Sequence, residues 1–160
     1  MFENFPVREY LGNLNLWNVS KMAFFASRNS SEMEKEKIRC WGRNQAKNGV
    51  CFIGTFHSDA EKALLHTALK NGGSAVWILG KSIPVELSHV EGKALDEDRL
   101  LILSCHQRLH YSTATSRFAN HISALHADTV VFASISRESL LYPFYRLLHG
   151  RRTSETIRVK

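Results

Sequence analysis

The stretch YLGNLNLWN at residues 10–18, followed by MAFFASR at residues 22–28, decides the fold that the sequence predicts. A short polar approach segment leads into an apolar run that is too short for a buried helix. The run ends in Ser27 and Arg28, which open a polar loop before a capped helix. This order is typical of the first strand of a parallel α/β sheet. Because open α/β sheets bind ligands where their strands end, Ser27 and Arg28 form the first candidate site.

The rest of the chain alternates between predicted helices and predicted strands. Ser31 and Glu34 have the spacing of a capping box, and Ser58 and Glu61 repeat it. The predicted strands span residues 22–25, 50–55, 75–79, 100–103, 129–133 and 156–159. The predicted helices span residues 31–47, 58–71, 113–126 and 140–148, and a further short helix is expected between residues 81 and 98.

The strands contain consecutive apolar residues rather than alternating ones, which predicts burial on both faces. We therefore predict an α/β fold with a single Rossmann-like, doubly wound, mainly parallel sheet of about six strands flanked by helices. Residues 1–20 are expected to pack on this domain as an N-terminal approach segment, and residues 21–160 to form it. A chain of 160 residues with a hydrophobic fraction of 44% also fits one folded domain.

Charge and cysteine content narrow the class of protein. The formal net charge is +6, which favours anionic partners, nucleic acid above all, although cations that serve only solubility explain it equally well. Cys40, Cys51 and Cys105 are scattered and odd in number, which argues for a reducing compartment. The start lacks a basic region followed by a long apolar stretch. We therefore expect a cytoplasmic protein without a membrane partner.

Loops at the ends of the predicted strands carry residues that suit an anion. If the strand order brings the first, second and fourth predicted strands together, the loops at residues 26–29, 54–58 and 104–108 converge on one crevice. Arg28 can present two parallel N–H donors to a phosphate, and helix N-termini add unpaired backbone N–H groups. The serines of these loops, taken alone, are better explained as helix caps.

Several other chemistries lack their usual motif. No Gly-x-Gly-x-x-Gly string follows the first strand and no Walker A string occurs, so ATP hydrolysis is not expected. Cys105, His106 and His110 offer one thiol and two imidazoles, but nothing completes a metal site. His57 and Ser58 are adjacent in sequence and lack a nucleophile elbow, which argues against a hydrolytic triad. The sequence favours a noncatalytic domain with neither cofactor nor metal.

The order and spacing of several segments resemble the core domain of the DprA/Smf family of DNA-processing proteins. The approach segment and the string Ala26-Ser27-Arg28 are similar to the family's Gly-Asn-Leu segment and Gly-Ser-Arg. Further similar segments lie at residues 52–69, 73–80, 101–104, 117–125, 128–133, 138–140 and 150–151. Departures fall on the motifs expected to bind, because Ala26 replaces a glycine, Gly54-Thr55 replaces Ser-Gly and Ala119-Asn120-His121 replaces Arg-Asn-Arg.

The resemblance implies a domain that binds single-stranded DNA through a basic pocket. It also implies a homodimer and a recombinase partner, since the family acts in this way. The loops and the resemblance together give the candidate phosphate-binding or nucleic-acid-binding residues Ser27, Arg28, Thr55, Ser58, Arg108, Arg117 and Asn120. The leading hypothesis is a noncatalytic domain that holds the phosphates of single-stranded nucleic acid.

Two further hypotheses belong to other functional classes. The first is a sensor that binds a nucleotide or a sugar phosphate, because a site for a strand's phosphate also suits a free one. Enzymes of this fold that cleave such ligands carry a Pro-Gly-Gly-x-Gly-Thr loop, and the sequence has no such string. The second is a degenerate interaction module that kept the fold and lost the ligand, which predicts an exposed apolar patch and self-association.

Overall fold

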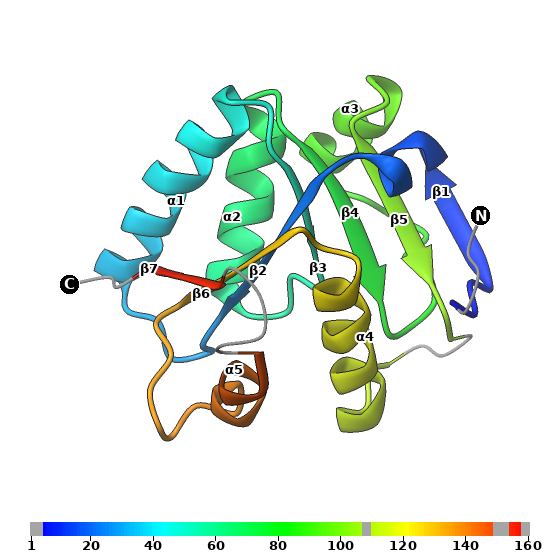
Figure 1. Ribbon diagram of the computed structural model, residues 1–160. Helices are drawn as coiled ribbons and strands as arrows, with labels where there is room; N and C mark the ends of the chain where they lie inside the picture. Colours follow the sequence, from blue (N-terminus) through cyan, green and yellow to red (C-terminus); the bar gives the residue numbers. More distant parts are fainter. Residues whose placement is uncertain (1–4, 107–109, 149–153, 158–160) are drawn as a thin grey trace.

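One mainly parallel sheet with helices on both faces organises the protein (Figure 1). The computed structural model describes residues 5–106, 110–148 and 154–157. The strands are β1 (Glu9–Gly12), β2 (Lys21–Ala26), β3 (Cys51–Gly54), β4 (Ser74–Leu79), β5 (Leu100–Ser104), β6 (Thr129–Ala133) and β7 (Ser154–Ile157). The helices are the 3-10 helix η1 (Leu14–Asn18), α1 (Glu32–Lys47), α2 (Asp59–Lys70), α3 (His89–Asp96), α4 (Thr113–Leu125) and α5 (Tyr142–Leu148).

The strand order β1-β5-β4-β3-β2-β6-β7 confirms the predicted doubly wound, Rossmann-like α/β fold. Strands β2 to β7 are parallel and correspond to the six predicted strands. The sheet has a seventh strand, β1, which lies antiparallel to β5 at the edge. This strand lies inside the segment that was predicted only as an approach to the domain. Its side chains are largely exposed, so it carries no hydrophobic pattern.

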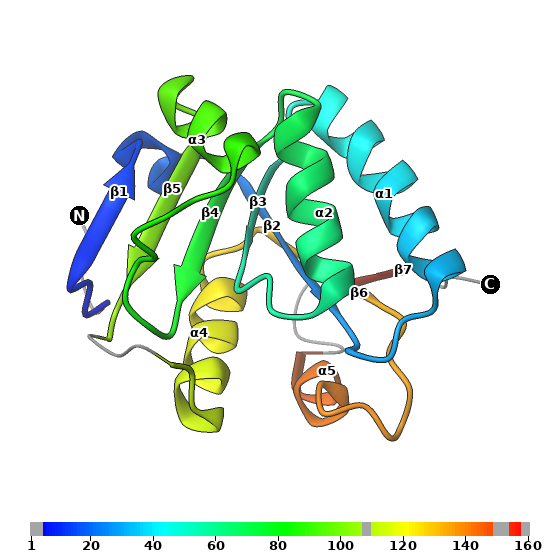
Figure 2. The ribbon, with the colours of Figure 1, turned by 180° about the vertical axis from the view of Figure 1, so that it is seen from behind.

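The central strands are buried on both faces, as their consecutive apolar residues predict. Ala23 and Phe25 belong to a core cluster that includes residues of η1 and α4, with residues of α5 packed against it. Phe24 and Ala26 belong to a second cluster, with residues of α1, α2 and α3. Successive side chains of a strand point to opposite faces, so one apolar run serves both clusters. Figure 2 shows α1, α2 and α3 on the face opposite to α4.

Serine side chains begin four of the helices. Ser31, Ser88 and Ser112 each form a complete capping box with the residue three positions later. Ser58 accepts a hydrogen bond from the N–H of Glu61, but the Glu61 carboxylate accepts hydrogen bonds elsewhere. The capping box predicted at Ser58 is therefore only half formed.

The connections place a crevice at the ends of β2 and β6. Helix α1 follows β2 on one face of the sheet, and α5 follows β6 on the other. The chain thus leaves neighbouring strands toward opposite faces, which is where open α/β sheets bind ligands. Strand β4 separates β3 from β5, so the ends of those two strands are not neighbours.

Among the described residues, no helix has the length and apolar character that crossing a membrane requires.

Gly12 ends the edge strand in a conformation that favours glycine, with a φ of 105°. A Cβ there would collide with the carbonyl oxygen of Leu100. We predict that Gly12→Ala lowers the free energy of unfolding by at least about 2 kcal/mol, through backbone strain and overpacking together. Gly72→Ala is the matched control, because its φ is also positive and a Cβ would meet no atom within 4 Å. Equal losses in urea denaturation would contradict the steric explanation.

Candidate anion-binding pocket

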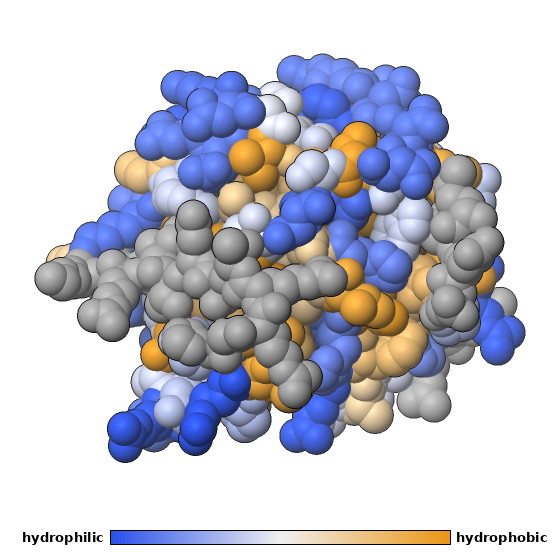
Figure 3. All heavy atoms as spheres, viewed as in Figure 1, coloured by the Kyte–Doolittle hydropathy of each residue, from blue (hydrophilic) through white to orange (hydrophobic). Residues whose placement is uncertain are grey.

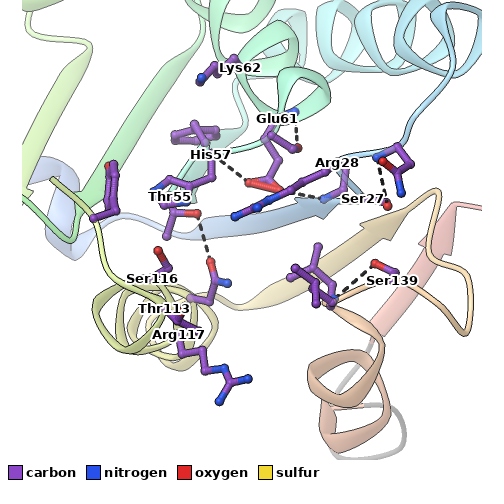
Figure 4. A pocket seen from close by; sticks show the side chains of 18 of the residues that line it. Ser27, Arg28, Thr55, His57, Glu61, Lys62, Thr113, Ser116, Arg117 and Ser139 are labelled. Carbon is purple, nitrogen blue, oxygen red and sulfur yellow. Dashed lines mark hydrogen bonds between the residues drawn. The ribbon is translucent and has the colours of Figure 1, made fainter.

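A pocket of about 840 Å³ opens where β2, β3 and β4 end (Figure 4). Its walls come from the loops after these strands, the N-terminal half of α4 and the segment that precedes α5. Strand ends and helix N-termini thus meet at this one place. Both leave backbone N–H groups without partners in regular structure, which suits an anion.

Six of the seven predicted site residues line this pocket, namely Ser27, Arg28, Thr55, Ser58, Arg117 and Asn120. Arg108 lies outside the described residues. The expected convergence of the loop at residues 104–108 does not occur for residues 104–106, although Tyr111 and Ser112, later in the same connection from β5 to α4, do line the pocket. Ser104 is buried, and its hydroxyl donates a hydrogen bond to the carbonyl of Lys81.

The two predicted serines are held by local structure. Ser27 is buried, and its hydroxyl accepts a hydrogen bond from the N–H of Asn29 at 3.3 Å. Ser58 is also buried and caps α2. Each hydroxyl therefore already accepts a backbone hydrogen bond, in agreement with their interpretation as structural residues.

Thr55 and Asn120 form a contact between the end of β3 and α4. The Thr55 hydroxyl donates a hydrogen bond to Asn120 Oδ1 at 3.0 Å, and Figure 4 shows this bond below Thr55. Because the bond uses the amide oxygen, the NH₂ group of Asn120 is the part that can donate to a ligand. This pair thus presents a hydrogen-bond donor, rather than an acceptor, to the pocket.

Four cationic side chains line the pocket: Arg28, Lys62, Lys81 and Arg117. None of them takes part in an ion pair within the described part of the chain, where all ion pairs lie on α1 or around α3. Two carboxylates, those of Glu61 and Glu138, also line the pocket. The uncompensated positive charge favours an anionic ligand.

Lys62 and Lys81 were not predicted as site residues. Lys62 lies in the first turns of α2, and Lys81 follows β4 directly after Gly80. The Lys81 ammonium lies over the ring of Tyr111, 5.3 Å from its centre. The only available signal was the place of Lys62 near a helix start and of Lys81 at a strand end, and it becomes informative once the order of the strands is known.

The pKa of His57 reflects the positive charges around the pocket. Its pKa is lowered to about 4, mainly by burial and further by the positive charges of Arg28, Lys62 and Lys81. Its ring lies edge-on against Tyr111 with ring centres 3.8 Å apart, and Nε2 is buried without a hydrogen-bond partner among the described residues. His57 is therefore neutral at neutral pH, and cations from two loops and from α2 act on it together.

A smaller apolar groove of about 310 Å³ adjoins the pocket along α5. It shares Arg117, Asn120, Leu140 and Leu141 with the pocket, and its other lining residues are mainly apolar. Leu140 is 80% exposed and Leu147 is 47% exposed at this groove. Figure 3, which views the face that carries α4, shows hydrophobic residues in separate patches and hydrophilic residues along its upper edge. An exposed apolar surface was the expectation of the interaction-module hypothesis, which stays a hypothesis.

No group of three or more His, Cys, Asp or Glu side chains is placed to hold a metal ion in residues 5–106 and 110–148. Cys105 is buried, and burial raises the pKa of its thiol to about 11. A thiol that stays protonated is a poor metal ligand and a poor nucleophile.

Comparison with solved structures identifies the fold. DprA from Streptococcus pneumoniae superposes with a TM-score of 0.75 at 21% identity, over 94% of this chain and 54% of that one. DprA from Helicobacter pylori, whose structure is described by its single-stranded DNA binding mode, superposes with a TM-score of 0.74 at 17% identity. The match covers 94% of this chain and 71% of that one. The molybdenum cofactor carrier protein of Chlamydomonas reinhardtii superposes with a TM-score of 0.56 at 13% identity, over 86% of this chain and 75% of that one. No family model and no curated protein sequence matches the chain.

The chain is thus a Rossmann-like domain with a basic pocket at the carboxyl ends of its strands. More narrowly, its fold is DprA-like, which confirms at the level of fold the resemblance found in the sequence. The chain spans about half the length of the Streptococcus pneumoniae protein.

The low pKa of His57 predicts a pH effect on stability. The unfolded chain binds a proton at His57 near pH 6.5, whereas the folded protein does so only near pH 4. The ionisation of His57 therefore lowers the free energy of unfolding as the pH falls from about 6.5 to about 4. We predict that the free energy of unfolding of His57→Gln, relative to that of the wild type, is about 1 kcal/mol higher at pH 5 than at pH 7. This value allows for solvent screening around the ring.

Urea denaturation of both proteins at the two pH values measures this difference. The matched control is His66→Gln, which alters an exposed histidine on α2 that does not line the pocket. A His57→Gln variant that differs from the wild type by the same free energy at pH 7 and pH 5 would contradict the interpretation.

Proposed function

We propose that this domain binds single-stranded nucleic acid and holds the strand's phosphates in the pocket. The observation that carries the proposal is the set of unpaired cations around a pocket at the strand ends. The DprA-like fold supports it, since a neighbour of that fold is described as binding single-stranded DNA.

The pocket residues suggest how a phosphate is held. Arg28 is exposed, and Figure 4 shows its side chain extending over the pocket, where its planar guanidinium can donate two parallel hydrogen bonds. The Asn120 amide donates from the opposite wall, and the N-termini of α2 and α4 add partial positive charge. Arg117 extends away from the other labelled side chains, where it suits a neighbouring phosphate.

This mode of binding is electrostatic and positional rather than catalytic. Contacts to phosphates position a strand without reading its bases, so affinity depends on salt and little on sequence. The proposal gives no residue a catalytic role. A homodimer and a recombinase partner, implied by the family resemblance, belong to the same proposal as partners of a domain that holds single strands.

We predict that Arg28→Ala weakens binding of a fluorescent single-stranded oligonucleotide for all sequences alike. The slope of log affinity against log salt should fall by about 0.7, the value for one lost phosphate contact on a single strand. Arg43→Ala is the matched control, because Arg43 is an exposed cation on α1 that does not line the pocket. Fluorescence anisotropy at several salt concentrations measures both quantities, and an unchanged slope would remove Arg28 from the site.

A nucleotide or sugar-phosphate sensor is the second candidate function. The pocket volume of about 840 Å³ favours it, because sites for small ligands lie between roughly 300 and 1,000 Å³. The same cations and helix N-termini would hold a free phosphate group. The two candidates therefore share one pocket and differ in whether the phosphate belongs to a chain.

A thermal-shift comparison separates the two candidates. A ligand at 100 times its Kd stabilises a folded protein by about 2.7 kcal/mol, which shifts the melting temperature measurably. We predict a shift with a short single-stranded oligonucleotide and none with nucleoside monophosphates at millimolar concentration. A shift with a monophosphate of similar size to that with the oligonucleotide would favour the sensor.

A further inference from the structure

The Glu61 side chain joins two loops of the pocket. Glu61 lies in the first turn of α2 and is 3% exposed. One carboxylate oxygen accepts a hydrogen bond from the N–H of Ala26 at 3.0 Å, and the other accepts one from the N–H of His57 at 3.1 Å. Figure 4 shows Glu61 between the loop of Ser27 and Arg28 and the loop of His57. One buried carboxylate thus connects segments that lie 31 residues apart.

Both N–H groups lie beyond the point where β2 and β3 stop pairing, although Ala26 still pairs with Ala133 of β6 on the other side. Strand β2 continues to Ala26, beyond its last pairing with β3 at Ala23 and Ile53. His57 follows Phe56, whose positive φ of 47° turns the chain away from β3. A buried N–H without an acceptor costs as much as a lost hydrogen bond, and Glu61 supplies the acceptor for both. The positions of the two loops therefore depend on this side chain.

Glu61 also has partners beyond the local cap that its sequence pattern predicts. The corresponding side chains of Glu34 and Glu91 fold back onto the N–H of their own cap residues at 2.6 and 2.8 Å. Glu61 has the same spacing from Ser58, yet its two oxygens accept from Ala26 and His57. A carboxylate that reaches beyond its own cap to two loops of a basic pocket indicates a role in that pocket.

We propose that Glu61 is the positioning residue of the pocket: its ionised carboxylate holds the Ser27–Arg28 loop against the His57–Ser58 loop, and its protonation weakens anion binding. A protonated carboxyl keeps one good acceptor oxygen, so one of the two N–H groups loses its partner. Arg28 then loses its fixed position relative to α2. This inference rests on the proposed function for its ligand, and it adds a proton-dependent control of the site.

Burial raises the pKa of Glu61 to about 7, while the hydrogen bonds from Ala26, His57 and Ser58 lower it. The neighbouring titratable group is His57 on the adjoining loop, and the positive charges of Arg28, Lys62 and Lys81 lower the pKa of its ring. His57 is neutral above about pH 4, so Glu61 is the group of this pair that titrates between pH 6 and pH 8.

The direction of the expected effect is distinctive. Proton uptake by Glu61 stabilises the fold relative to the unfolded chain, because its folded pKa is raised; this stabilisation is lost as pH rises from about 4.5 to about 7. Anion binding should change in the opposite sense and strengthen over the upper part of this range. A site whose binding depended on a protonated histidine would instead bind more weakly as pH rises.

The test uses the full chain, a fluorescent single-stranded oligonucleotide and constant ionic strength at pH 6, 7 and 8. We expect wild-type affinity to rise about three- to tenfold from pH 6 to pH 8, and Glu61→Gln to bind weakly at every pH. Glutamine has one acceptor oxygen and no titrating group, so it mimics the protonated side chain. Glu34→Gln is the matched control and should retain the wild-type pH profile. A Glu61→Gln variant with wild-type affinity at pH 8, or with the wild-type pH profile, would overturn the proposal.

Backbone amide chemical shifts of the free wild-type protein give a second readout that needs no ligand and no folded variant. The N–H signals of Ala26 and His57 should titrate together with a midpoint near pH 7. Signals that do not share a midpoint would overturn the role of Glu61 in joining the loops. Shared titration in a protein that binds no oligonucleotide at any pH would instead reject the proposed ligand and leave the coupling of the loops intact.

Discussion

Burial of both faces of the parallel strands is the constraint on which the rest of the structure depends. Phe24 and Phe25 are adjacent in sequence and completely buried in different core clusters. Helices must therefore cover both faces, and the chain has to leave β2 toward one face and reach β6 from the other. The crevice between these two connections collects strand ends and helix N-termini. The pocket is a consequence of how the core is closed.

The elements buried in this core could be predicted from the sequence, because their signals are local. Apolar runs mark the parallel strands and serine caps mark the helix starts, each within a few residues. Strand β1 could not be predicted in this way, since an exposed edge strand needs only a backbone partner, here β5. The order of the strands depends on contacts between distant segments. Residues 104–106 at the end of β5 were therefore expected at a crevice that only Tyr111 and Ser112, later in that connection, reach.

The same distinction applies to the candidate site. Ser27 and Arg28 could be predicted because they directly follow a strand. Lys62 and Lys81 could not, because a lysine at a strand or helix end is ordinary until the loops are known to meet. Glu61 illustrates the limit most clearly, since its spacing from Ser58 predicts a local capping box. Only the packed structure shows that its carboxylate accepts hydrogen bonds from two backbone N–H groups that have no partners in the sheet.

The departures from the DprA/Smf motifs therefore have different consequences in space. Ala26 replaces a glycine, but it is 1% exposed and belongs to the core cluster shared with α1 and α2, where a methyl group adds to the packing. His121 replaces an arginine, and its ring lies edge-on against Phe144 with ring centres 4.9 Å apart. The charge lost from α4 there is offset by Lys62 and Lys81 on other elements. A pocket keeps its preference for anions when cations converge on it, whichever element supplies them.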